Sequence, residues 1–145
     1  MTFGAWLNMN RVVMVLRIKG RVGIDPDVEK TLESLKLDKA FAAGLYPLTP
    51  SLEGMLRKAQ RYLTWGRPNS KTIYTFLKEA GYVAEDALKF AEKLENGESS
   101  LDSPVLLNLR PPSKGFKRSV KRAFKSGGEY GDRGDEINDL FRRMT

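Results

Sequence analysis

The 145-residue sequence predicts an α+β fold, because signals for strands and helices alternate along the first half of the chain. The apolar, β-branched run from Val12 to Ile18 is typical of a buried strand, and Lys19-Gly20 ends it. Asp25-Pro26 and Thr49-Pro50 are helix-start signals, since Asp and Thr cap a helix and Pro fits its first position. A strand therefore precedes the first of two well-marked helices.

Apolar spacing supplies the other elements of the first half. Val28, Leu32 and Leu35 recur at helical spacing after the first start signal. Residues 40–46 predict a second strand, and residues 63–66 predict a short third one. The second helix has its own apolar stripe, which consists of Leu52, Met55, Leu56, Ala59 and Leu63. The predicted order is strand, helix, strand, helix, strand.

The second half of the chain predicts two further helices, at residues 70–80 and 84–95, and a strand at 105–109. A basic arm follows from Arg110 to Lys125. Glycines at 127–128 and 131–134 predict turns, and a final short helix begins near Asp135. These elements extend the α+β core with helices and a basic segment.

Composition limits the chemistry that is available. The chain has 25 Lys and Arg against 18 Asp and Glu, a net charge of +7, and neither cysteine nor histidine. Disulfides, thiolate metal sites and the commonest general base are therefore excluded. No apolar run approaches the roughly 20 residues of a membrane span, so we expect a soluble intracellular protein. We also expect it to use no cofactor and no small-molecule substrate.

Charge is sorted along the chain rather than mixed. The basic stretches are residues 1–24, 51–78 and 110–125, whereas residues 25–50 and 79–102 are acidic. If the basic stretches meet in the folded chain, they form one anion-binding face with an acidic face elsewhere.

The arm from Arg110 to Lys125 is the most basic of these stretches, with seven cations and no acidic residue. Phe116 and Phe124 lie among the cations, which suits a polyphosphate with exposed bases. Two interpretations of these rings remain open, namely stacking on nucleic-acid bases and anchoring of the arm to its own domain. Trp65 presents the same choice between base stacking and core packing.

A catalytic alternative rests on carboxylates near the C-terminus. Asp132, Asp135, Glu136 and Asp139 could hold a divalent metal, as in a metal-dependent RNA-processing nuclease. Carboxylates at the start of a helix are also what the helix dipole favours, and this simpler explanation is preferred. Another alternative is a transcription or repair factor that binds DNA.

Four segments in the same order resemble the L-thirty family of large-subunit ribosomal proteins in its archaeal form, whose eukaryotic members are called L-seven. They are RIKGRVGIDPDVEKTLESLKL, TPSLEGMLRKAQRYLTWG, LNLRPPSKGFK and GGEYGDRGDEINDLFRRM. The resemblance implies a ferredoxin-like βαβαβ core, with a three-stranded antiparallel sheet and two helices on one face. It divides the chain into an N-terminal extension (1–10), an rRNA-binding core (11–67) and an archaeal-type extension (68–145).

The resemblance also implies a function. Such proteins are structural constituents of the cytoplasmic ribosome rather than enzymes, and they bind large-subunit rRNA near the 5S RNA region, beside other ribosomal proteins. Together with the basic stretches, it predicts a set of RNA-contacting residues that share positive charge, an aromatic ring or close backbone approach. These are Arg17, Lys19, Arg21, Arg57, Lys58, Arg61, Trp65, Arg67, Arg110, Lys114, Gly115, Phe116, Lys117, Arg118, Lys121, Arg122 and Lys125.

Overall fold

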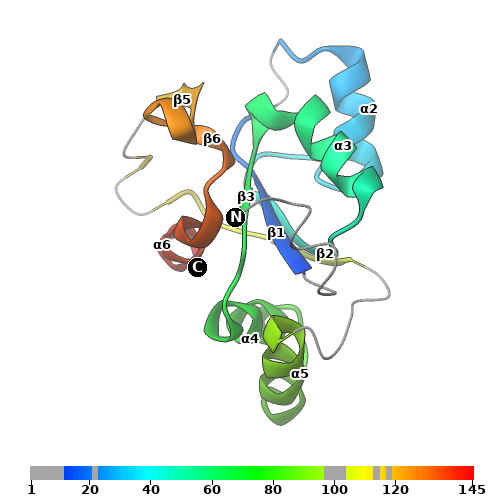
Figure 1. Cartoon of the computed structure of the whole chain (residues 1–145), viewed down its shortest axis with the longest axis vertical. Coiled ribbons are helices and arrows are strands. Elements are labelled where there is room, and N and C mark those ends of the chain that lie inside the picture. Colours follow the sequence, from blue (N-terminus) through cyan, green and yellow to red (C-terminus); the bar gives the residue numbers. More distant parts are fainter. Residues whose placement is uncertain (1–11, 21–22, 97–103, 113–114, 117–118) are drawn as a thin grey trace.

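A computed structural model describes residues 12–20, 23–96, 104–112, 115–116 and 119–145 (Figure 1). The strands are β1 (Val12–Arg17), β2 (Ala42–Pro47), β3 (Leu63–Gly66), β4 (Val105–Asn108), β5 (Ser119–Ala123) and β6 (Gly128–Asp132). The helices are α2 (Pro26–Ser34), α3 (Pro50–Lys58), α4 (Ser70–Glu79), α5 (Ala84–Asn96) and α6 (Ile137–Met144). Short 3₁₀ turns are η1 (Gln60–Tyr62), η2 (Phe124–Ser126) and η3 (Gly134–Glu136).

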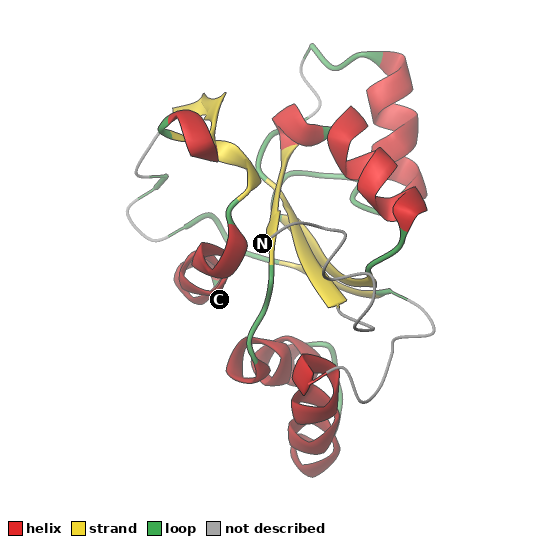
Figure 2. Cartoon of the chain, in the orientation of Figure 1, coloured by secondary structure: helices red, strands yellow, loops and turns green. Residues whose placement is uncertain are grey.

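The strands, which are yellow in Figure 2, form one sheet in the order β4-β2-β1-β3-β6-β5, with β1 near its centre. β1 pairs antiparallel with both β2 and β3, and β4 pairs antiparallel with β2. The predicted α+β class is confirmed. The sheet is larger than the three strands predicted, because β4 extends it beyond β2, and β6 and β5 extend it beyond β3.

Helices cover both faces of the sheet. Val13 and Val15 of β1 pack with buried residues of α2 and α3, whereas Met14 and Leu16 pack with α4, α5 and α6. Successive side chains of a strand point to opposite faces, so a strand covered on both sides is apolar along its length, as β1 is from Val12 to Leu16. The C-terminal half of the chain therefore closes the face that α2 and α3 leave open.

The predicted helix starts are confirmed at atomic detail. The Asp25 side chain accepts a hydrogen bond from the Asp27 amide at 2.9 Å, and Pro26 occupies the first turn of α2. The Thr49 hydroxyl oxygen accepts from the Leu52 amide at 3.1 Å, ahead of Pro50. Each cap satisfies an amide that has no partner within its own helix.

The glycine-rich C-terminal segment differs from its prediction. Gly127 does form a turn, with φ of 82°, but the following residues form β6 rather than a second turn. Part of the basic arm is likewise a strand, β5. The final helix lacks the expected side-chain cap at its start; η3 precedes α6, and the Asp132 carboxylate accepts from the Gly134 amide at 2.9 Å.

Among the residues that the structure describes, no helix combines the length and apolarity needed to cross a membrane.

Candidate nucleic-acid interface

Three predicted contact residues from separate parts of the sequence lie close together, with one lysine at the centre. Lys19 follows β1, Arg61 lies in η1 and Lys121 lies in β5, and the charges of Arg61 and Lys121 both act on the Lys19 ammonium. The pKa of Lys19 is lowered below its usual range, mainly because the side chain is partly buried and also because these two positive charges lie near it. We call Lys19, Arg61 and Lys121 the cation cluster.

Two tyrosines hold the central lysine. The Lys19 ammonium lies 5.7 Å from the ring centroid of Tyr62 and 5.9 Å from that of Tyr130. Both rings are partly exposed, and a cation over a ring face gains about 0.5–1 kcal/mol at such sites. Lys19 takes part in none of the ion pairs formed between described residues. Its charge is thus positioned by aromatic rings and is not neutralised by a carboxylate.

Sheet pairing explains why the cluster forms. The Ile18 amide donates to the Tyr62 carbonyl at 2.9 Å, which places Lys19 beside η1. On the other side, β6 pairs with β3 and β5 pairs with β6, so Tyr130 and Lys121 come from the next two strands along. The cluster therefore joins the N-terminal half of the chain to its C-terminal arm.

A buried arginine fixes β6 against β3. Arg133 donates through Nε to the Thr64 hydroxyl at 2.7 Å and through Nη2 to the Glu129 carboxylate at 2.9 Å. The guanidinium carbon lies 5.0 Å from the ring centroid of Phe124, and Thr64 donates to the Gly131 carbonyl at 2.9 Å. The Arg133 and Glu129 side chains are only 5% and 4% exposed. This network positions the strand that carries Tyr130.

The contact residues predicted from the sequence did not include Tyr62, Tyr130 or Arg133. The neighbouring pair Arg61-Tyr62 carried a usable signal, since a basic residue beside an aromatic one suits RNA. Tyr130 gave no such signal, because it lies in a glycine-rich segment that was predicted to be a turn.

Two of the predicted contact residues are buried in the fold. Arg17 is 1% exposed, and its guanidinium donates to the carbonyls of Leu37 at 2.7 Å and Lys19 at 2.8 Å. Trp65 is 4% exposed and packs among the residues that α2 and α3 cover. Neither side chain is presented on the surface of the folded chain, and this argues against the prediction that they contact RNA. Arg17 ties β1 to the segment after α2, and Trp65 belongs to the core.

The rings of the arm contact their own chain. Phe116 is partly buried and stacks on Phe41, with ring centroids 6.4 Å apart, against the core on the α4 to α6 side. Phe124 lies under the Arg133 guanidinium. Of the two open interpretations, anchoring of the arm to its own domain fits these contacts, and contact of Phe116 with RNA stays a prediction.

The remaining predicted contacts are distributed over other surfaces. Arg57, Lys58, Arg110, Arg122 and Lys125 are exposed. Arg57 pairs with Glu53 at 2.6 Å along α3. Gly115 has φ of 74°, and its carbonyl accepts a hydrogen bond from the Arg143 guanidinium. The others, Arg21, Lys114, Lys117 and Arg118, lie outside the described residues.

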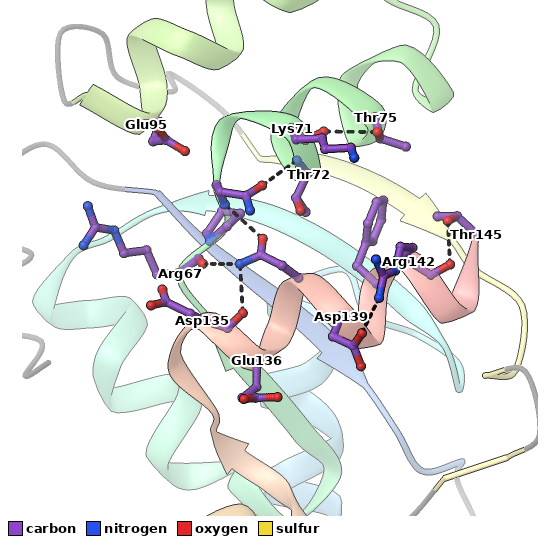
Figure 3. A pocket seen from close by; sticks show the side chains of 14 residues that line it. Arg67, Lys71, Thr72, Thr75, Glu95, Asp135, Glu136, Asp139, Arg142 and Thr145 are labelled. Carbon is purple, nitrogen blue, oxygen red and sulfur yellow. Dashed lines mark hydrogen bonds and ion pairs between the residues drawn. The ribbon is translucent and has the colours of Figure 1, made fainter.

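Arg67 lies in a different environment, a cavity of about 640 Å³ between α4 and α6 (Figure 3). Asp135, Asp139 and Glu95 also line this cavity, so it carries both signs of charge. Asp139 forms an ion pair with Arg142 at 2.6 Å. In the described part of the chain, no three residues of the metal-ligating types are grouped closely enough to hold an ion. The carboxylates of the metal hypothesis are therefore engaged in structural contacts or dispersed.

A small α+β protein with a partly desolvated cation cluster belongs, by fold and surface chemistry, to the class suited to binding polyanions. A family model described as "Ribosomal protein L30p/L7e" matches residues 13–63, which span β1 to the start of β3. Relatives named large ribosomal subunit protein uL30 match nearly the whole chain. The one from Ignicoccus hospitalis is 39% identical over 92% of this chain and 98% of its own length.

Two further archaeal relatives of the same name give similar values. The one from Korarchaeum cryptofilum is 37% identical over 92% of this chain and 94% of its own length. The one from Sulfolobus acidocaldarius is 34% identical over 94% of this chain and all of its own length. This chain belongs to the L30p/L7e family of ribosomal proteins, in the form that archaea carry.

Proposed function

We propose that this protein is a structural constituent of the large ribosomal subunit, where it binds and stabilises rRNA and catalyses no reaction. Family membership supports the ribosomal role. The observation that supports RNA contact is the gathering of Lys19, Arg61 and Lys121 from three separate parts of the chain. A phosphate group beside the cluster would relieve the mutual repulsion of these cations, and contacts of this kind release counterions from RNA.

The finer parts of the proposal concern location and organisation. The rRNA contacted lies near the 5S RNA region of the cytoplasmic ribosome, beside neighbouring ribosomal proteins. Residues 11–67 form the ferredoxin-like rRNA-binding core, residues 68–145 form the archaeal-type extension, and residues 1–10 precede both. Because Lys121 lies in the extension and Lys19 in the core, RNA bound at the cluster would contact both parts.

The cation cluster can be tested by neutralising Lys19, Arg61 and Lys121 to Gln together. The slope of log affinity against log salt for a large-subunit rRNA transcript should become shallower by about 2–3, because each lost phosphate contact removes about 0.7–0.9. Titrations by fluorescence anisotropy between about 0.05 and 0.3 M salt measure this slope.

The matched control changes the same number of exposed lysines elsewhere, namely Lys30, Lys89 and Lys93 to Gln. It should keep the slope within about one unit of the unmodified chain. A triple-cluster variant that keeps its circular dichroism spectrum and its full slope would contradict the role of the cluster. Failure of the unmodified chain to bind the transcript would contradict rRNA binding itself.

The arm beyond the cluster makes a separate contribution in this proposal. Neutralising Lys117, Arg118, Lys121 and Arg122 together should weaken binding and flatten the salt slope by about 3–4. The difference in salt slope between this variant and the Lys121→Gln variant measures the contribution of the other three cations. An arm variant no different from that single variant would limit the contact to the cation cluster.

A further inference from the structure

Exposed apolar side chains are concentrated at one place on this molecule. Among the described residues, the large hydrophobic side chains that stand out as exposed are Tyr82 at 42%, Val83 at 66% and Leu88 at 50%. All three lie within seven residues, where α4 turns into α5. Single apolar residues scattered over a surface are ordinary, whereas several of them exposed close together in the chain make a candidate interaction site.

The exposure is not a sign of a poorly packed hairpin. Ala87, Ala91 and Leu94 on the inner side of α5 are fully buried against the core. The turn itself is ordered by the Tyr82 amide, which donates to the Leu77 carbonyl at 3.0 Å. The Tyr82 ring stacks on Phe90 with centroids 6.5 Å apart. The apolar patch is therefore a fixed surface feature that no described residue covers.

The sequence around this patch is acidic, although Lys78 and Lys93 flank it. From Glu79 to Glu92 the chain carries four carboxylates and one lysine, although the whole protein is at +7. Glu85 and Asp86 lie in the first turn of α5, where the helix dipole favours them. That explanation does not apply to Glu79, in the last turn of α4, or to Glu92, in the second half of α5. All four carboxylate residues are exposed.

On the helix surface, Leu88 lies between two of these carboxylates. Glu85 precedes it by three positions and Glu92 follows it by four, so both are its neighbours on the same face. The hairpin tip, by which we mean residues 79–92, thus presents exposed apolar side chains, and carboxylates flank one of them, Leu88. A charged border around an apolar centre is the usual anatomy of a protein interface.

The hairpin tip is also remote from the cation cluster. In Figure 1, α4 and α5 project at the lower end of the long axis, whereas β5 and β6 lie in the upper half. A phosphate backbone would be repelled by the carboxylates of the tip, since like charges facing each other oppose binding. The molecule therefore has two chemically opposite surfaces, and RNA fits only one of them.

We propose that the hairpin tip docks a basic protein segment, which places an apolar side chain against Val83 and Leu88 and Lys or Arg side chains against the flanking carboxylates. This inference rests on the proposed function, because the partner is sought among the proteins of the large ribosomal subunit. Charge complementarity selects the partner, since an acidic border steers and holds a cationic one.

The absence of cysteine from the sequence allows a clean test. Val83→Cys and Leu88→Cys variants, each carrying a benzophenone attached to the new thiol, are incorporated into large subunits, purified by sedimentation and irradiated. We expect cross-links to a protein, stable to ribonuclease and destroyed by protease, in a peptide rich in Lys and Arg. The matched control is Glu33→Cys on the exposed surface of α2, which should give at most about a tenth of that yield.

A second variant tests the role of charge. Glu85→Lys, Asp86→Lys and Glu92→Lys, added together to the Leu88→Cys chain, should lower the cross-link yield about fivefold or more. Cross-links to RNA, to a second copy of this chain, to another segment of the same chain or to an acidic peptide would overturn the inference, as would none at all. If these variants co-sediment with the subunit but give such a result, only the docking inference fails. If the unmodified chain does not co-sediment, the proposed function fails with it.

Discussion

At the residue scale, two arginines of this chain have structural roles that positive charge alone does not reveal. Arg17 lies inside the apolar run that predicts the first strand, and a strand covered on both faces buries every side chain in it. The position of Arg17 within this strand therefore predicts a buried side chain. Lys19 lies just past the end of β1 and is partly accessible. Arg133 could not be placed in this way, because its ion pair, its hydroxyl partner and its aromatic partner all depend on how β6 pairs.

The Arg133–Glu129 pair leads to a prediction about stability. Arg133→Met leaves a buried carboxylate without its cation, and this should lower the free energy of unfolding by about 3–5 kcal/mol. Glu129→Leu combined with Arg133→Met removes both charges, so the double variant should be more stable than Arg133→Met alone. Urea unfolding followed by circular dichroism measures both changes.

The exposed pair Arg57–Glu53 provides the control, since the Arg57 side chain is 73% exposed. Arg57→Met should change the free energy of unfolding by no more than about 1 kcal/mol. An Arg133→Met variant as stable as this control would show that the buried network does not hold β6 in place.

At the scale of secondary-structure elements, sequence patterns located the helices and strands that carry a local signal. The caps at Asp25 and Thr49 and the apolar run of β1 predicted their elements, because each depends on residues close together in the chain. β6 was missed, since its glycines indicate turns when they are considered alone. A Cβ at Gly128 would lie 2.0 Å from the Arg122 carbonyl oxygen, so this glycine permits close approach of the β5 backbone.

A second close approach, at Gly66, gives a prediction for how β3 meets the C-terminal segment. A Cβ there would lie 2.1 Å from the Gly134 carbonyl oxygen and 2.8 Å from the Ile137 Cβ. Gly66→Ala must therefore displace η3 and the start of α6, and it should lower the free energy of unfolding by about 1–3 kcal/mol. The same urea titration measures the change.

Gly54 is the matched control, because it lies in α3 with nothing within 4 Å of an added Cβ. Gly54→Ala should raise the free energy of unfolding by about 0.5–1 kcal/mol, as expected for an exposed helix position. Opposite signs for the two substitutions would support the close packing at Gly66, and equal effects would refute it.

At the scale of the whole molecule, the sequence predicted a core with an extension appended to it, but the structure joins them in one sheet. The apolar sequence of β1 predicts this joining of the two parts. The strand from Val12 to Arg17 is apolar at every position before its last, so it needed cover on both faces, while α2 and α3 cover only one. The sequence also indicated that the basic stretches could meet in the fold. It did not indicate which cations meet, because that depends on the pairing of β6 with β3 and β5, which no short sequence pattern predicts.

This joining predicts the effect of cutting the chain after Leu109, which removes β5, β6 and α6. The cut exposes the β3 edge and deletes four buried side chains of α6, those of Ile137, Leu140, Phe141 and Met144. At about 1.5–3 kcal/mol each, their loss amounts to about 6–12 kcal/mol, comparable with the whole stability of an ordinary domain. We therefore expect the shortened chain to lack a cooperative urea transition, whereas deletion of the exposed Thr145 alone should preserve it. A cooperative transition with a native-like spectrum in the shortened chain would instead establish that the part of the chain before the arm folds without it.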